Sequence, residues 1–434
     1  MSSEYLQDLQ TGLSPNERLY QIIEHGMCIG CGLCQSLVGE KKLTIQEVAS
    51  GYERPVIHGE LKHQHVDDIM DVCPGTRVEG LPVRLLEKDS HNDEVWGVYR
   101  DIYFSYSAEA AVRHMASTGG VLTALALYLV ESKTVDFVLH AKASTTNPTF
   151  GEATISRTRE DVLTAAGSRY GPTATLKDFV EVLDQAEQSS EKFAFIGTPC
   201  DVNALRNYAG MDKRVHLYCT HMLVMVCGGF MAPKNLQDFL AGNQIDHQHI
   251  QTLRYRGYGC PGATRIEMDD GTVHEFSYLD FWGDDDSLWG LPPRCKVCPD
   301  GIGDAADIAA SDTWDGGAPT VEESATDLGS NAAIVRTLAG EQLMDAAIEA
   351  GYLVRGDALT PEDMNRFQPH QEVKKRAVGA RFDGMRAAGN IVPDTRGLRI
   401  GQLQKLNEAE INQEAAAGAK LRVENGKFKE NRPE

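Results

Sequence analysis

The chain has 434 residues, enough for two or three domains, and its 42 Lys and Arg against 63 Asp and Glu give a net charge of −21. A negative field of this size opposes binding to the phosphate backbone of nucleic acids. No run approaches the roughly 20 apolar residues of a membrane-spanning helix, and the N-terminus shows no secretory signal. We therefore expect a cytoplasmic protein whose ten cysteines serve chemistry other than disulfide bonding.

The first motif is a run of closely spaced cysteines near the N-terminus. Cys28, Cys31 and Cys34 follow one another at three-residue steps with glycines in the gaps, and Cys73 is followed directly by proline. A backbone that curls tightly around a cubane, with a last ligand from a distant Cys-Pro, is typical of 4Fe-4S binding. Zinc is the structural alternative, but zinc sites usually show two separated pairs. The spacing predicts a 4Fe-4S cluster.

The segment around this motif is predicted to be a ferredoxin-like domain over residues 1–98. The 38 residues between Cys34 and Cys73 are long for a ferredoxin loop, and Gly51 to Pro55 within them indicate a hairpin insert. Such an insert is tolerated because the free energy of loop closure grows slowly with loop length.

From about residue 100 the pattern changes to alternating helices and apolar strands. Helices are expected over 121–132 and 176–189, and strands over 135–143, 192–197 and near 215–218. This alternation is typical of α/β organisation. It predicts an α/β domain, with a first half at 99–190 and a second half at 191–330.

Short antiparallel strands are expected over 251–276, with a turn at 269–272, and a loop over 283–286. Beyond residue 330 a helical extension is predicted over 331–434.

Within the extension, helices are expected over 338–350 and 361–366. The polar segment 401–434 is predicted to be a solvated helix with a frayed tail, although it could equally dock a partner subunit.

Six further cysteines are dispersed. Cys200, Cys227, Cys295 and Cys298 obey no local spacing rule, and a lone cysteine after an apolar strand is more often a buried small hydrophobe than a ligand. Cys219 is assigned to packing, and Cys260 to packing or to the lining of a substrate pocket.

Three glycine-rich corners could hold a phosphate-bearing ligand: residues 117–120, 167–171 and 256–262. The first opens an apolar helix whose free N–H groups could face an anion, with glycines allowing close approach. The second combines a hydroxyl, a guanidinium and an aromatic ring. Ordinary turn and helix-capping chemistry explains each corner equally well when it is taken alone.

Taken in order, these motifs resemble the β-subunit family of coenzyme F420 hydrogenases and dehydrogenases. This flavin and iron-sulfur group also includes 7-hydroxymethyl chlorophyll a reductase and one type of divinyl chlorophyllide 8-vinyl reductase. The resemblance runs from about Cys28 to about Gly317, and its carriers are CIGCGLC, STGG, AGSRYGPT, GTPC, VCGGF, YRGYGCPG and RCKVCPDGIGDAADIAASDTW. The residues after Cys34, Gln-Ser-Leu-Val-Gly-Glu, depart from the tyrosine-rich segment of the chlorophyll-pathway members.

The resemblance implies FAD and two 4Fe-4S clusters. Carried over by position, the second cluster would be held by Cys200, Cys227, Cys295 and Cys298. The flavin-contacting positions would be Thr118, Gly119, Gly120, Ser168, Arg169, Tyr170, Thr198, Arg256, Gly259 and Gly262. Cys260 stands where the family motif leads us to expect another residue type.

These cofactors permit exchange between a two-electron substrate and one-electron clusters, because a flavin converts between the two. The leading hypothesis is an enzyme that passes electrons between ferredoxin and an unidentified small molecule. The alternative is a β subunit that transfers electrons between coenzyme F420 and a catalytic partner. A zinc-stabilised binding module is the third. His114, His140, His221, Asp300 and Asp312 lie near motifs, but none is assigned as a proton donor.

Overall fold

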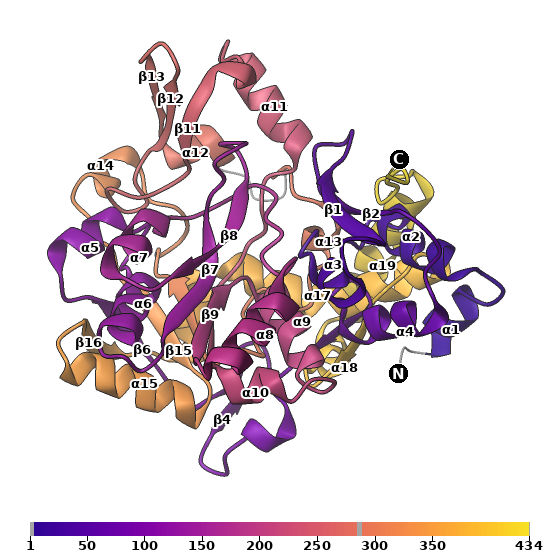
Figure 1. The fold of residues 1–434 in the computed structure, drawn as a ribbon, viewed down its shortest axis with the longest axis horizontal. Helices are drawn as coiled ribbons and strands as arrows, with labels where there is room; N and C mark the ends of the chain where they lie inside the picture. Colours follow the sequence, from indigo (N-terminus) through magenta and orange to yellow (C-terminus); the bar gives the residue numbers. More distant parts are fainter. Residues whose placement is uncertain (1–3, 284–288, 434) are drawn as a thin grey trace.

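The computed structural model describes residues 4–283 and 289–433, and its centre is an eight-stranded mixed sheet of order β16-β6-β15-β14-β10-β9-β7-β8 (Figure 1). The inner strands β7, β9, β10 and β14 pair in parallel with one another. On one side β8 pairs antiparallel with β7, and on the other side β15, β6 and β16 continue the sheet by antiparallel pairing from β14. The bounds are β6 Asp101–Ser107, β7 Phe137–Ala143, β8 Gly151–Ser156, β9 Phe193–Gly197, β10 Cys219–Met225, β14 Ile308–Asp312, β15 Asn331–Val335 and β16 Leu353–Ala358. The expected mixed α/β class is confirmed.

Two apolar cores cover the two faces of this sheet, because successive side chains of a strand point to opposite sides. Phe193 and Phe195 of β9 join one core and Ala194 the other. Helices α8 (Phe179–Ser189) and α9 (Pro199–Tyr208) contribute to the first core, whereas α6 (Val121–Glu131) and α15 (Leu338–Glu349) contribute to the second. The first core also receives Leu33 and Val72 from the N-terminal segment.

Around this centre lie shorter elements. They are α5 Ala110–Met115, α7 Arg159–Ala165, α10 Arg214–Tyr218, α11 Pro233–Gly242, η2 His247–His249, α12 Tyr278–Trp282, α13 Pro293–Lys296 and α14 Val321–Ser324. A three-stranded antiparallel sheet is built from β11 Ile250–Arg254, β12 Thr264–Met268 and β13 Val273–Phe276, as expected for 251–276. The loop expected at 283–286 falls, beyond Gly283, outside the described residues.

The strand expected near 215–218 is wrong, because these residues form α10 and the strand begins only at Cys219. The turn that leads into the helix is held at Asp212, whose carboxylate accepts the backbone N–H of Arg214 at 2.9 Å and whose carbonyl oxygen accepts that of Val215 at 3.2 Å. The apolar run that enters the sheet is the one that follows, β10.

The N-terminal segment contains the expected hairpin of β1 and β2. Its elements are α1 Glu4–Leu9, α2 Pro15–Glu24, α3 Leu33–Val38, β1 Leu43–Glu47, β2 Glu53–Ile57, α4 His63–Val72, β3 Arg77–Glu79, η1 Val83–Leu85, β4 His91–Asp93 and β5 Gly97–Tyr99. Strand β3 pairs with a strand from the far end of the chain, β17 (Asp394–Arg396). The N-terminal and C-terminal segments therefore fold together.

The C-terminal segment contains the solvated helix expected within 401–434, since residues 409–424 are helical with Ala419 alone buried, but its tail is not frayed, because Phe428 is buried. It comprises α16 Pro361–Phe367, α17 Pro369–Ala387, β17, α18 Ile400–Leu406 and α19 Ala409–Glu424. Phe382, Ala419 and Phe428 are buried in one core with Leu19 and Val66 of the N-terminal segment.

Figure 1 shows α19 lying beside the N-terminal elements α2 and β2. The tail beyond α19 is fixed by an ion pair between the buried side chains of Arg54 and Glu430, 2.8 Å apart. Among the described residues, no helix has both the length and the apolar character needed to cross a membrane.

Candidate functional site

The first cysteine group surrounds a cavity in the N-terminal segment. The thiols of Cys28, Cys31, Cys34 and Cys73 line one apolar pocket. The loop needs its glycines: Gly30 has φ +77°, and a Cβ there would lie 2.6 Å from the carbonyl oxygen of Glu53. The predicted set of four is therefore brought together by a backbone that only glycine permits.

The chemistry of this cavity is that of thiols shielded from water. Burial raises the pKa of Cys73 to about 12 and also raises the pKa values of Cys28, Cys31 and Cys34. Within residues 4–283 and 289–433, no three His, Cys, Asp or Glu side chains are close enough to hold a single metal ion. The four predicted thiols are therefore buried together around one pocket.

The second cysteine group is assembled from three places in the chain. Cys200 lies in the first turn of α9, Cys227 follows β10, and Cys295 and Cys298 lie at α13. Burial and then the charges of Asp201, Cys227 and Cys298 raise the pKa of Cys200, and burial raises that of Cys227 to about 12. The dispersed cysteines are therefore neighbours in space.

The backbone around Cys227 is tightly held. Its N–H donates to the carbonyl oxygen of Gly301 at 2.7 Å, and its carbonyl oxygen accepts the side-chain amide of Gln371 at 2.9 Å. A Cβ at Gly229 would lie 3.1 Å from the Cβ of Cys295. Thr198, expected at the flavin, caps α9 and lies 3.0 Å from the Cys200 sulfur, so its contacts are with this cysteine group.

Two charged side chains lie between the cysteine groups. Asp201 follows Cys200, and its charge contributes to the raised pKa of both Cys200 and Cys31. Burial raises the pKa of Asp201 itself to about 6. Arg294, which directly precedes Cys295, is 2% exposed. Its guanidinium donates to the carbonyl oxygen of Pro74, the residue after Cys73, at 2.8 Å. The two groups are adjacent rather than separate sites.

The three glycine-rich corners meet at a buried arginine. The Arg256 guanidinium forms an ion pair with Asp312 at 3.0 Å and donates to the Thr118 hydroxyl at 2.9 Å and the Tyr170 hydroxyl at 3.2 Å. Trp314 stacks on the same guanidinium at 4.7 Å. Thr118, Tyr170 and Arg256, predicted from separate motifs, therefore form one cluster.

The other predicted residues of these corners lie close by. The Ser168 hydroxyl donates to that of Ser117 at 2.8 Å, and the Gly259 N–H donates to the carbonyl oxygen of His114 at 3.1 Å. A Cβ at Gly262 would overlap the carbonyl oxygen of Gly257. The loop 256–262 is thus folded back on the segment that precedes α6.

Arg169 differs from Arg256 because no partner in the described chain satisfies it. Its guanidinium takes part in no hydrogen bond or ion pair among the described residues, and its Nε is buried. Burial lowers the pKa of Arg169. A half-buried cation that has no counter-charge among the described residues, beside Ser168 and Tyr170, fits the phosphate of a bound nucleotide-type cofactor.

Gly119 and Gly120, expected at the flavin, lie against other parts of the chain on the side where a Cβ would point. A Cβ at Gly119 would lie 2.7 Å from the backbone nitrogen of Asn331, and one at Gly120 would lie 3.2 Å from the Cβ of Ala116. The space beside both glycines is filled by protein. They allow α6 to begin against β15, so a larger residue here would disturb the fold.

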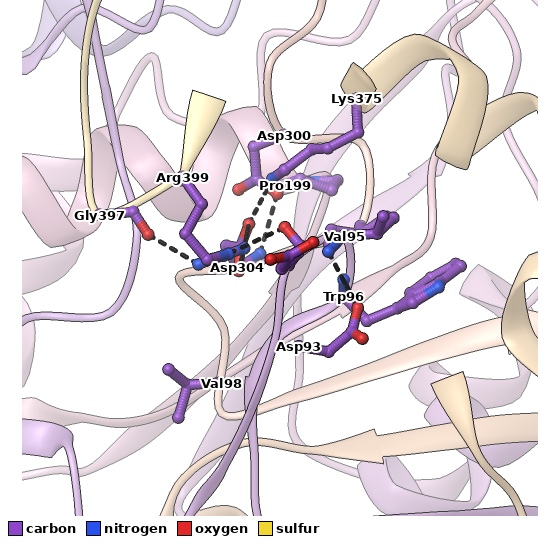
Figure 2. A network of polar contacts seen from close by, with 12 residues as sticks. Asp93, Val95, Trp96, Val98, Pro199, Asp300, Asp304, Lys375, Gly397 and Arg399 are labelled. Carbon is purple, nitrogen blue, oxygen red and sulfur yellow. Dashed lines mark hydrogen bonds and ion pairs between the residues drawn. The ribbon is translucent and has the colours of Figure 1, made fainter. Parts of the chain in front are cut away.

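A buried ionic network lies next to the second cysteine group (Figure 2). Lys375 and Arg399 both pair with Asp304, and Arg336 approaches it at 4.0 Å. Burial by itself would raise the pKa of Asp304, but these cations hold it well below its usual range. Burial and then the charge of Asp304 raise the pKa of the neighbouring Asp300.

The remaining candidates have partners within the chain. His140 is buried beside the Ser156 hydroxyl at 2.7 Å, and His221 contacts Thr220 at 2.9 Å. Asp312 is paired with Arg256. Cys219 is buried in the first core, as expected, and Cys260 accepts from the Trp314 ring nitrogen at 3.5 Å.

Sequence reasoning missed the residues that connect these parts. Asp201 could have been noticed because it follows Cys200 directly. Arg294 could have been noticed because it directly precedes Cys295, whereas Gln371 and Lys374 carry no local signal, since their contacts are made with residues far away in the chain.

The chain matches two models of the coenzyme F420 hydrogenase/dehydrogenase beta subunit, that of its N-terminal part over residues 102–179 and that of its C-terminal part over residues 190–358. It is 23% identical to the coenzyme F420-dependent sulfite reductase of Methanocaldococcus jannaschii over 83% of this chain and 52% of that protein. It is 27% identical to the F420-dependent formate dehydrogenase 1 subunit beta of Methanococcus maripaludis over 61% of this chain and 63% of that protein. The chain thus spans between half and two thirds of these relatives.

A coenzyme F420 hydrogenase subunit beta from Methanococcus voltae is 25% identical over 59% of this chain and 84% of its own length. A chain of the F420-reducing [NiFe] hydrogenase complex from Methanosarcina barkeri superposes with a TM-score of 0.46 at 20% identity, over 66% of this chain and 95% of that one. From the family and sequence matches, the chain belongs to the coenzyme F420 hydrogenase/dehydrogenase beta-subunit family of oxidoreductases.

Proposed function

We propose that the protein is an iron-sulfur flavoprotein that transfers electrons between coenzyme F420 and a catalytic partner, through FAD and two 4Fe-4S clusters. The observation that carries this proposal is the four-thiol cavity adjoining a second group of four cysteines, with Arg294 and Asp201 between them. Adjacent cysteine groups suit stepwise one-electron transfer, and a flavin supplies the exchange with a two-electron partner.

Each part of the chain has its own task in this proposal. The first cysteine group holds one cluster, and Cys200, Cys227, Cys295 and Cys298 hold the second. Arg169 meets the FAD phosphates with a cation that lacks any other partner among the described residues. Arg256, fixed by Asp312, holds the three corners together beside Thr118 and Tyr170.

The relatives favour coenzyme F420 over the ferredoxin-linked reductase that the sequence put first. Their names pair F420 with sulfite, with formate or with hydrogenase. Since the second reaction differs and F420 is shared, the common segment is the one expected to handle F420. The part of the sulfite reductase outside the match, about half of its length, leaves room for a separate catalytic unit. A ferredoxin partner and a cytoplasmic location remain predictions.

Cofactor content tests the proposal. We expect anaerobically purified protein to hold about eight iron atoms and one FAD per chain. Cys31→Ser and Cys298→Ser should each lose about four iron atoms, whereas Cys219→Ser, which alters a buried thiol outside both groups, should lose none. FAD should remain in all three variants.

Two outcomes would contradict it. Stoichiometric zinc without iron would support the binding-module hypothesis. Full cofactor content, with reduction by ferredoxin but none by reduced F420, would support the ferredoxin-linked reductase.

A further inference from the structure

Helix α17 lies beyond residue 358, where the family match ends, yet its first turns reach both parts of the candidate site. The side-chain amide of Gln368, just before the helix, donates to the carbonyl oxygen of Asp312 at 3.0 Å. Gln371 donates to the carbonyl oxygen of Cys227 at 2.9 Å, and the Lys374 ammonium donates to that of Gly228 at 3.1 Å. One helix therefore contacts the arginine cluster and the second cysteine group.

The sequence spacing accounts for these contacts. Gln371, Lys374 and Lys375 are three and four residues apart, so they share one face of the helix. Gln371 and Lys375 are each 2% exposed. A Cβ added at Gly301 would overlap the side-chain oxygen of Gln371. This face is packed closely against the loop that carries Cys227.

The charges on this face are not equivalent. Lys375 is paired with the buried carboxylate of Asp304, whereas Lys374 forms no ion pair among the described residues. Its ammonium lies instead at the carbonyl oxygen of Gly228, next to Cys227, and a Cβ added at the following Gly229 would lie 3.1 Å from the Cβ of Cys295. A positive charge that has no ion-pair partner in the described part of the chain thus faces the second cysteine group.

We propose that Lys374 is a positioning residue that holds a positive charge at the second cluster and raises its reduction potential. This inference rests on the proposed function, since it requires a cluster on Cys200, Cys227, Cys295 and Cys298. Four thiolates give a cluster a net negative charge that grows by one on reduction. A nearby cation stabilises the reduced state more than the oxidised state, and partial burial limits screening by salt.

The test is an anaerobic redox titration of the purified protein, followed by EPR to resolve the two clusters. Lys374→Gln should lower the reduction potential of the second cluster by about 59 mV, which corresponds to a tenfold change in the equilibrium constant of a one-electron reduction. The first cluster should not change. Lys374→Arg should keep the native potential, and Arg376→Gln, which removes a cation paired with Glu372 on the same helix, should have no effect.

The outcomes separate the two proposals. Wild-type protein without a second cluster would refute the proposed function. Both clusters present, with an unchanged potential in Lys374→Gln, would overturn the role of Lys374 alone. If Lys374→Gln loses the iron of the second cluster, the redox titration is repeated with Lys374→Met. The same lowering of the second cluster's potential is expected there. Loss of that iron in both variants would mean that Lys374 is structural, and would overturn the inference.

Discussion

Two arginines in the candidate flavin site have opposite surroundings, and the difference points to their functions. Arg256 is 4% exposed, and its charge is balanced by Asp312. Arg169 carries the same charge in a largely buried position without any partner among the described residues. A folded chain rarely retains an uncompensated buried charge, so Arg169 is expected to be satisfied by a ligand.

We therefore predict that Arg169→Ala weakens FAD binding by about tenfold or more, because a charge-assisted contact with a phosphate is lost. The wild-type affinity should fall as salt rises from about 50 to about 500 mM, and the variant should show a smaller dependence. Released flavin fluorescence after gel filtration measures the occupancy. Arg157→Ala, which removes a surface pair with Glu191, is the matched control. Full FAD retention in Arg169→Ala at every salt concentration would remove this side chain from the flavin site.

A second residue-scale prediction concerns His140. Burial lowers its pKa to about 4, below the ordinary value near 6.5. Between pH 4 and about pH 6.5, the His140 imidazole is protonated in the unfolded chain but neutral in the folded chain. The folded state therefore has its full stability above about pH 6.5 and loses part of it as the pH falls toward 4. The loss amounts to about 3 kcal/mol at most.

The measurement is the urea midpoint from about pH 7.5 to about pH 5.5, taken anaerobically. His140→Gln should be less stable at neutral pH, because its fit beside Ser156 is altered, but should show a flatter pH profile. The exposed His63→Gln should follow the wild-type profile. Parallel profiles for His140→Gln and wild type would contradict the assignment.

The residue scale also shows what the sequence can predict. The eight cysteines, Thr118, Tyr170 and Arg256 could be found because each belongs to a short motif. Arg54 and Lys374 could not, since their significance arises from partners more than 100 residues away.

At the scale of elements, regular patterns were predictive and the contacts of single residues were not. The turn at 269–272 correctly predicted the hairpin of β12 and β13, and the helix expected at 338–350 is α15. Residues 215–218 look like a strand, but the contacts of Asp212 with the Arg214 and Val215 N–H groups hold the turn that leads into a helix. The composition of the tail is polar, yet its Phe428 is buried in the core shared with the N-terminal segment.

The tail should therefore stabilise the segment around the first cysteine group. Glu430→Gln leaves the buried Arg54 guanidinium without its carboxylate and should destabilise this segment by about 3 kcal/mol. Urea denaturation and iron retention measure the effect. Glu424→Gln, which breaks an exposed pair with Lys420, should change stability by less than about 0.5 kcal/mol. Equal stability of Glu430→Gln and Glu424→Gln would show that the tail contributes nothing to this segment.

At the scale of the whole molecule, the N-terminal segment is joined to the central sheet as well as to the tail. The Leu176 N–H donates to the carbonyl oxygen of Cys31 at 2.8 Å, and the Val180 N–H donates to the Ser36 hydroxyl at 2.7 Å. The sequence suggested a ferredoxin-like unit that folds separately, because contacts between distant segments leave no local pattern. These contacts hold the first cysteine group against α8 and α9, beside Cys200.

This arrangement gives the proposed electron route a defined order: FAD, the second cluster, the first cluster and then a partner. The net charge of −21 opposes an acidic partner unless a basic surface receives it.

The most direct measurement is an anaerobic titration of the purified protein with reduced coenzyme F420, followed by absorbance and EPR. One FAD and two one-electron clusters require about two equivalents of a two-electron donor. We predict that about two equivalents of F420 are oxidised per chain and that both cluster signals appear. No oxidation of F420, or oxidation of about one equivalent with both clusters remaining oxidised, would contradict the proposed route.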